Sequence, residues 1–111
     1  MNFVTLIRSF LKKFQDRFPP FQIVNVSNSF PKSLKKKRIY VLLEDGEPWE
    51  ARFLCPCGCG DALDLSLLAD DHPTWTAKSG INRRATLHPS IWRKAGCLSH
   101  FFIRDGKVIW I

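Results

Sequence analysis

The chain lacks a long uninterrupted hydrophobic segment near its start. The apolar residues of segment 1–18 are interrupted by charged ones, namely Arg8, Lys12, Lys13, Asp16 and Arg17. A secretory signal needs an apolar core of about 7–15 residues and a bilayer-spanning helix needs about 20. We therefore expect a cytoplasmic protein in a reducing compartment, where disulfides are rare.

Internal repeats and low-complexity linkers are also lacking, which argues against a solenoid and against several domains. The sequence has 111 residues, of which 45% are hydrophobic, enough for one domain with a modest core. We expect this domain to span residues 21–111 and to follow a basic helix over residues 1–20.

The expected helix is amphipathic, because apolar residues recur at three- and four-residue steps between basic ones. They are Phe3, Ile7, Phe10, Phe14 and Phe18. Pro19 and Pro20 end the pattern. Such a helix either packs its apolar stripe on the domain, lies on a membrane surface or docks on a partner.

Positive charge is concentrated in the first third of the chain. Residues 1–38 carry nine Lys/Arg and one Asp, a net charge of +8, whereas residues 39–111 carry eight Lys/Arg and nine Asp/Glu, a net charge of −1. No aromatic interleaving or groove-reading motif accompanies the run at 35–38, which disfavours nucleic-acid binding. A membrane surface reached through residues 1–18, or an acidic protein, fits this charge better.

Beyond residue 20 the pattern predicts short strands and tight turns, hence a mostly β domain that is α+β with the helix included. Asp45–Pro48 is expected to form a turn, and Asp105-Gly106 is the signal of a type I′ hairpin. The antiparallel sheet is expected to contain strands at 21–26, 39–44, 49–54, 62–67, 75–77, 85–87, 99–104 and 107–110.

The four cysteines are grouped in a way that suits a metal ion. Cys55, Cys57 and Cys59 fall within six residues, and Cys97 is the fourth. Cysteines one residue apart rarely bridge each other, whereas a loop bent at Gly58 and Gly60 can direct alternate sulfurs to one ion. We expect a zinc knuckle with one structural Zn²⁺, because four thiolates complete its shell. Two disulfides or free thiols are the alternatives.

Candidate catalytic residues lie close to Cys97 in the sequence. His100 is a base, a partner of the metal site, or a zinc ligand if one cysteine is spare. Ser90 begins an expected short helix at 90–95, where backbone N–H groups could stabilise an oxyanion; the alternative is an ordinary N-cap serine. Ser99 adjoins His100 on a strand and should point away from it. Glu44, or else Glu50, is the candidate carboxylate that would orient the histidine.

Four motifs occur in order: LCPCGCG at 54–60, LHPSI at 87–91, CLSHFFI at 97–103 and GKVIW at 106–110. From about Ile39 to Trp110 the chain thereby resembles the small BubE-type family of bacterial ubiquitination-like (Bub) operons. The resemblance implies a serine-type peptidase that processes or removes a ubiquitin-like protein and works beside E1- and E2-like enzymes. It favours Ser90, Ser99 and His100 as residues to test. The alternative is a non-catalytic zinc-knuckle module that binds an acidic protein or nucleic acid through residues 8–38.

Deleting residues 1–18 is expected to weaken association with an anionic membrane or a partner more than it weakens peptidase activity, because this basic segment contains no polar constellation suited to catalysis. Vesicle co-sedimentation and turnover would be measured on the deleted and the full chain. Loss of turnover in a deletion variant that still folds would instead assign the segment to the active site.

Overall fold

The structure is a computed structural model that describes residues 19–111. The helix expected over residues 1–20 therefore lies outside the described residues, apart from Pro19 and Pro20, which are not helical. Within residues 19–111, no helix is long and apolar enough to cross a membrane.

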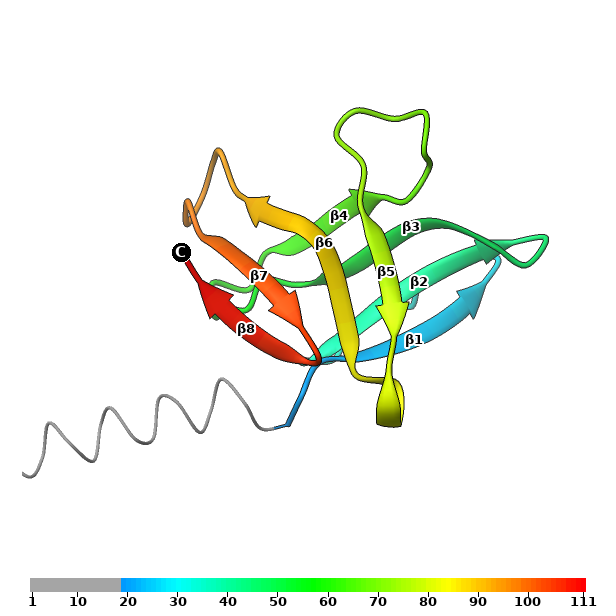
Figure 1. Cartoon of the computed structure of the whole chain (residues 1–111), viewed down its shortest axis with the longest axis horizontal. Coiled ribbons are helices and arrows are strands. Elements are labelled where there is room, and N and C mark those ends of the chain that lie inside the picture. Colours follow the sequence, from blue (N-terminus) through cyan, green and yellow to red (C-terminus); the bar gives the residue numbers. More distant parts are fainter. Residues whose placement is uncertain (1–18) are drawn as a thin grey trace, which may run out of the picture.

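Within residues 19–111, eight strands form two four-stranded sheets (Figure 1). The first sheet has the order β1-β2-β3-β4 and the second has the order β5-β6-β7-β8. A single 3₁₀ turn, η1 (Ile81–Arg83), separates β5 from β6. The strands are β1 (Gln22–Ser27), β2 (Arg38–Glu44), β3 (Glu47–Leu54), β4 (Ala62–Ser66), β5 (Thr76–Ser79), β6 (Ala85–Trp92), β7 (His100–Arg104) and β8 (Lys107–Trp110).

This architecture confirms the predicted mostly β domain, but two details of the prediction are wrong. β1 and β2 pair in parallel, so the first sheet is mixed. The short helix expected at 90–95 is wrong, because Ser90 to Trp92 continue strand β6. There Ile91 pairs with Phe101 of β7 and is buried, and this tertiary pairing outweighs the weak local helix preference.

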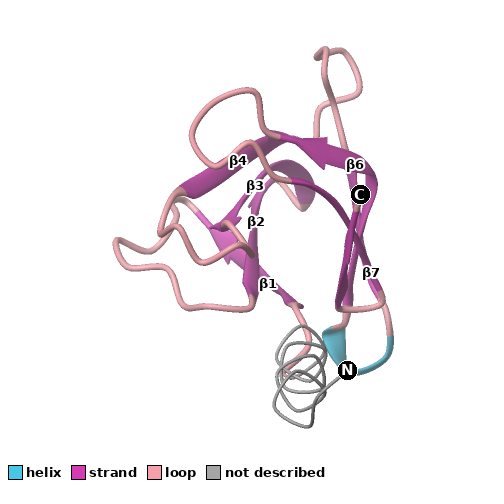
Figure 2. Ribbon diagram, turned by 90° about the vertical axis from the view of Figure 1, so that its left-hand side faces the viewer, coloured by secondary structure: helices cyan, strands magenta, loops and turns pink. Residues whose placement is uncertain are grey.

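The two sheets face each other around one apolar core (Figure 2). Residues pointing inward alternate with exposed ones, as in β7, where Phe101 and Ile103 are buried and Arg104 is exposed. Burying each large apolar side chain contributes about 1.5–3 kcal/mol. The largest fully buried side chains are Phe21, Phe53, Phe101, Ile39, Leu87 and Ile103.

Backbone hydrogen bonds join the sheets at one corner. The N–H of Phe21 donates to the carbonyl of Gly106 at 2.9 Å, the N–H of Ala85 to that of Phe21 at 3.0 Å, and the N–H of Gly106 to that of Ala85 at 2.8 Å. Asp105 and Gly106 have φ values of 48° and 77°, as the predicted type I′ turn between β7 and β8 requires. The turn thus closes a hairpin and connects the two sheets.

Gly106→Ala is expected to destabilise the fold more than Gly46→Ala does. Both glycines have positive φ, +77° and +79°, which costs a side chain about 1–2 kcal/mol. A Cβ at residue 106 would also lie 2.6 Å from Cβ of Pro20, whereas one at residue 46 would meet nothing within 4 Å. Crowding should lower the free energy of unfolding of Gly106→Ala by roughly a further 1–3 kcal/mol, and urea unfolding of both variants measures the difference. Equal losses in the two variants would contradict this close approach.

Candidate active site and metal centre

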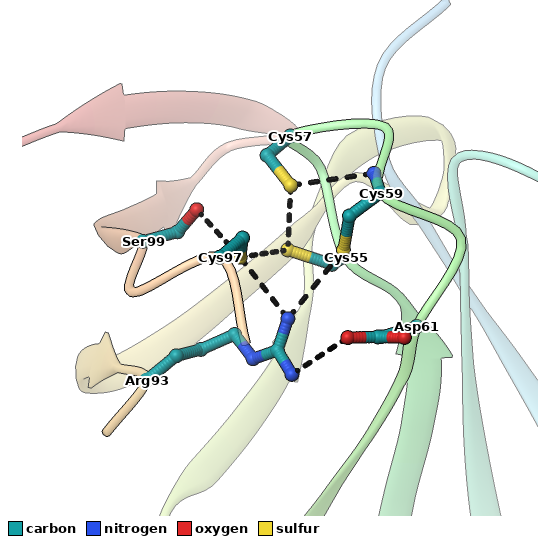
Figure 3. Close-up of polar contacts among 7 residues, drawn as sticks. All are labelled: Cys55, Cys57, Cys59, Asp61, Arg93, Cys97 and Ser99. Atoms are coloured by element: carbon teal, nitrogen blue, oxygen red, sulfur yellow. Dashed lines mark hydrogen bonds and ion pairs between the residues drawn. The ribbon is translucent and has the colours of Figure 1, made fainter. Parts of the chain in front are cut away.

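The four cysteines come from both sheets and converge at one point (Figure 3). Cys55, Cys57 and Cys59 lie in the loop that follows β3, and Cys97 lies in the loop between β6 and β7. Their sulfur atoms all lie within 4.8 Å of one another. Residues that are some forty positions apart in the sequence thereby form one potential ligand set.

The spacing of the sulfurs fits a tetrahedral metal ion. Sγ of Cys55 lies 3.4 Å from Sγ of Cys57 and 3.7 Å from Sγ of Cys97. A tetrahedron with metal–sulfur bonds of about 2.3 Å has sulfur–sulfur edges of about 3.8 Å. Gly58, between Cys57 and Cys59, and Gly60, directly after Cys59, bend the loop with φ values of +88° and +87°, as predicted. The cluster could therefore hold a metal ion.

Arg93 supplies positive charge to the cysteine cluster. Its Nη1 donates to Sγ of Cys97 at 3.0 Å and to Sγ of Cys59 at 3.5 Å, and its Nη2 donates to a carboxylate oxygen of Asp61 at 3.0 Å. Asp61 follows the first three cysteines, whereas Arg93 follows β6, so this ion pair also connects the two sheets. Sequence reasoning missed both residues, because neither belongs to a ligand motif.

The pKa values of two of the thiols are shifted in opposite directions from the ordinary value of cysteine. Burial raises the pKa of Cys55 to about 12, whereas hydrogen bonding to Ser99 lowers the pKa of Cys97 to about 6. At neutral pH without a metal ion, Cys97 is therefore mainly a thiolate and Cys55 a thiol. Metal binding would displace the proton of Cys55, because the thiolate is the ligand.

Ser90 and His100 form a hydrogen-bonded pair on neighbouring strands. Oγ of Ser90 lies 3.1 Å from Nε2 of His100, and both residues are half-buried. In the β6–β7 pairing Trp92 stands opposite His100, and Ser90 is two residues before Trp92 on the same face. The register thus brings Ser90 diagonally across to His100, without the helix start that sequence reasoning expected.

Aromatic side chains surround this pair. The indole of Trp92 stacks on the His100 imidazole, with 5.0 Å between ring centroids and 10° between planes. Nζ of Lys94 lies 2.9 Å from the centroid of the Trp92 ring. Nε1 of Trp75 donates to the backbone carbonyl of Ser90 at 3.3 Å. Sequence reasoning missed both tryptophans, although period-two spacing from Ser90 would have placed Trp92 on the same face.

The structure does not bring the other two candidates to the pair. Ser99 precedes β7, and its Oγ lies 3.0 Å from Sγ of Cys97. Glu44 ends β2 at the hairpin with β3, which lies at the opposite end of the molecule from the start of β7 (Figure 1). Glu50 forms an ion pair with Arg52. Within residues 19–111, no carboxylate is hydrogen-bonded to His100.

Comparison with known protein families gives a match for this chain. The sequence model of the family described as "Bacterial ubiquitination-like system serine protease (BubE)" matches residues 26–111, which is most of the chain. The chain belongs to the BubE family. No curated protein and no solved structure matches it significantly.

The BubE match includes the whole cysteine cluster and the hydrogen-bonded pair. It begins within β1 and reaches the last residue, so it spans both sheets. The resemblance stated from the four motifs is thereby confirmed. The family description names a serine protease, and Ser90 is the described serine that is hydrogen-bonded to a histidine in this BubE chain.

A metal ion held by the cysteine cluster would connect the two sheets, so its removal is expected to destabilise the domain strongly, because metal binding contributes to folding. Cys97→Ser should reduce metal content and lower the melting temperature. Leu98→Ala, which truncates the exposed neighbouring residue, should leave both unchanged. Elemental analysis and thermal unfolding with and without a chelator provide the measurement. Purified protein that contains no metal, or that has oxidised cysteines by thiol counting, would refute this expectation.

Proposed function

We propose that the protein is a serine-type peptidase that processes a ubiquitin-like protein, or removes it from targets, in a bacterial ubiquitination-like system. The observation that carries the proposal is the 3.1 Å contact between Oγ of Ser90 and Nε2 of His100, in a chain of a family described as serine proteases. A nucleophile and a base within hydrogen-bond reach are the minimum that acyl transfer requires.

In the proposed reaction His100 acts as the general base and Ser90 as the nucleophile. Nε2 of neutral His100 accepts the proton of the Ser90 hydroxyl while Oγ attacks the carbonyl carbon of the scissile bond. The protonated imidazole then donates that proton to the departing amine, which leaves an acyl ester on Ser90. Water, deprotonated by the same nitrogen, hydrolyses the ester and regenerates the hydroxyl.

We assign a structural Zn²⁺ to Cys55, Cys57, Cys59 and Cys97. Four thiolates complete a tetrahedral shell and leave no position for a substrate, which is the pattern of structural rather than catalytic zinc. The bound ion would supply folding free energy at the junction of the sheets. Within the chain, Arg93 partly neutralises the negative charge of the ligands, and the loop from Cys97 leads directly to His100.

The proposed substrate is a ubiquitin-like protein, with the E1- and E2-like enzymes of the same system as functional partners. A half-buried pair on a sheet face suits an extended peptide segment better than a compact small molecule. A non-catalytic zinc-knuckle module remains the alternative function, and it predicts binding without cleavage.

Ser90→Ala and His100→Ala are each expected to lower peptide-bond cleavage by a factor on the order of 10³ or more, because each removes one member of the reacting pair. Ser99→Ala should retain activity, since Ser99 contacts Cys97 and not His100. The substrate to be used is a ubiquitin-like protein of a bacterial ubiquitination-like system, carrying a C-terminal extension, and intact-mass measurement identifies the products.

Zinc content and circular dichroism of each variant separate lost chemistry from lost structure. If both serine variants keep full activity while a chelator abolishes it without unfolding the protein, the serine mechanism is wrong. Binding of the substrate by wild-type protein without any cleavage would favour the non-catalytic alternative.

A further inference from the structure

The side chain of Trp92 is large, apolar and more than half exposed, at 58% of its full accessibility. It lies outside the apolar core, so burial does not explain its position. Among residues 19–111, its one aromatic contact is the imidazole of His100, which lies directly opposite in the β6–β7 pairing. The described contacts thus connect this tryptophan to the histidine of the proposed pair.

His100 has one described side-chain hydrogen bond, from its Nε2 to Ser90. In serine proteases with a full triad, a carboxylate bonded to Nδ1 holds the ring in place and stabilises the imidazolium that forms during the reaction. Among residues 19–111, no group is hydrogen-bonded to Nδ1 of His100. A group other than a carboxylate would therefore have to hold the His100 ring in place and stabilise its imidazolium.

The stacked indole is suited to both tasks. The indole lies nearly parallel to the imidazole, with 5.0 Å between the ring centroids and 10° between the planes. This stacking restricts rotation of the imidazole and keeps Nε2 directed toward Ser90. The face of an indole is also electron-rich and attracts a cation, with tryptophan the best of the aromatic residues in this respect. Charge that develops on His100 during attack would be stabilised by this face.

We propose that Trp92 is the positioning residue of the active site, and that it performs through its ring face what an orienting carboxylate performs in a triad. The proposal rests on the proposed function, because it assigns His100 as the catalytic base. Lys94, whose ammonium group lies 2.9 Å from the centroid of the indole ring, helps to hold Trp92 in this orientation.

Steady-state kinetics of two Trp92 variants test its role as a positioning residue. Trp92→Leu, which removes the aromatic face, should lower kcat by about 10-fold and leave KM unchanged, as expected for a group that acts in the transition state. Trp92→Phe, which keeps a smaller ring, should recover kcat to within about 3-fold of wild type. Ile109→Ala, which truncates an exposed residue of the adjacent β8, should have no effect.

The role is overturned if Trp92→Leu keeps wild-type kcat, if the loss appears in KM alone, or if Trp92→Phe is as slow as Trp92→Leu. Melting temperature and metal content should match wild type in all three variants. A Trp92→Leu protein that has lost its metal would assign the residue to folding, which also overturns the proposal.

Fluorescence provides a readout that needs no substrate. A protonated imidazole quenches an indole stacked on it, so acidification should quench part of the tryptophan emission of the full chain. Among the described residues, His100 and Lys94 are the charged or titratable groups that contact Trp92. The quenching component should disappear in His100→Gln and in Trp92→Phe, and it should persist in Ser90→Ala.

Equal pH dependence in wild type and His100→Gln would show that the stack is absent in solution and would overturn the proposal. This result would leave the proposed peptidase function standing. Conversely, a wild-type protein that retains the quenching component but cleaves nothing would refute the peptidase function and, with it, the catalytic role of Trp92.

Discussion

The junction between the cysteine loop after β3 and the loop between β6 and β7 is the constraint on which the rest of the site depends. Cys55 lies in a loop of the first sheet and Cys97 in a loop of the second, and their sulfurs lie 3.7 Å apart. The ion pair of Arg93 with Asp61 crosses the same junction. The apolar core is modest, so connecting the sheets here fixes an edge that side-chain burial alone would hold weakly.

The contact between Ser90 and His100 depends on the same loop, because the loop connects β6 to β7 and their register sets that contact. The loop begins after Trp92 and ends at His100, and the N–H of Arg93 donates to the carbonyl of Ser99 at 2.8 Å across its base. A shift of one residue in this pairing would turn His100 to the opposite face and separate it from Ser90. A metal site that holds Cys97 would therefore preserve the Ser90–His100 contact without taking part in the proposed reaction.

The proposed pair of Ser90 and His100 would be a minimal arrangement of a nucleophile and a base. No described carboxylate orients His100, and the stacked indole of Trp92 is the group that restricts its ring. In the proposed site the half-buried Ser90 and His100 lie on the face of a sheet beside the exposed indole of Trp92. This arrangement is compatible with an extended protein segment as substrate.

Local sequence patterns were sufficient to predict the cysteine set and the strands that strong turn signals bound. Asp105-Gly106 specified its hairpin because type I′ turns need two residues with positive φ, and Gly58 and Gly60 specified the bend of the cysteine loop. The sequence also identified Ser90 and His100 as residues to test. The pairing of distant segments places Ser90 in a strand, brings Arg93 and Asp61 together beside the cysteines, and stacks Trp92 on His100. These features depend on which strands pair and in which register, and no local pattern encodes a contact between segments that are distant in sequence.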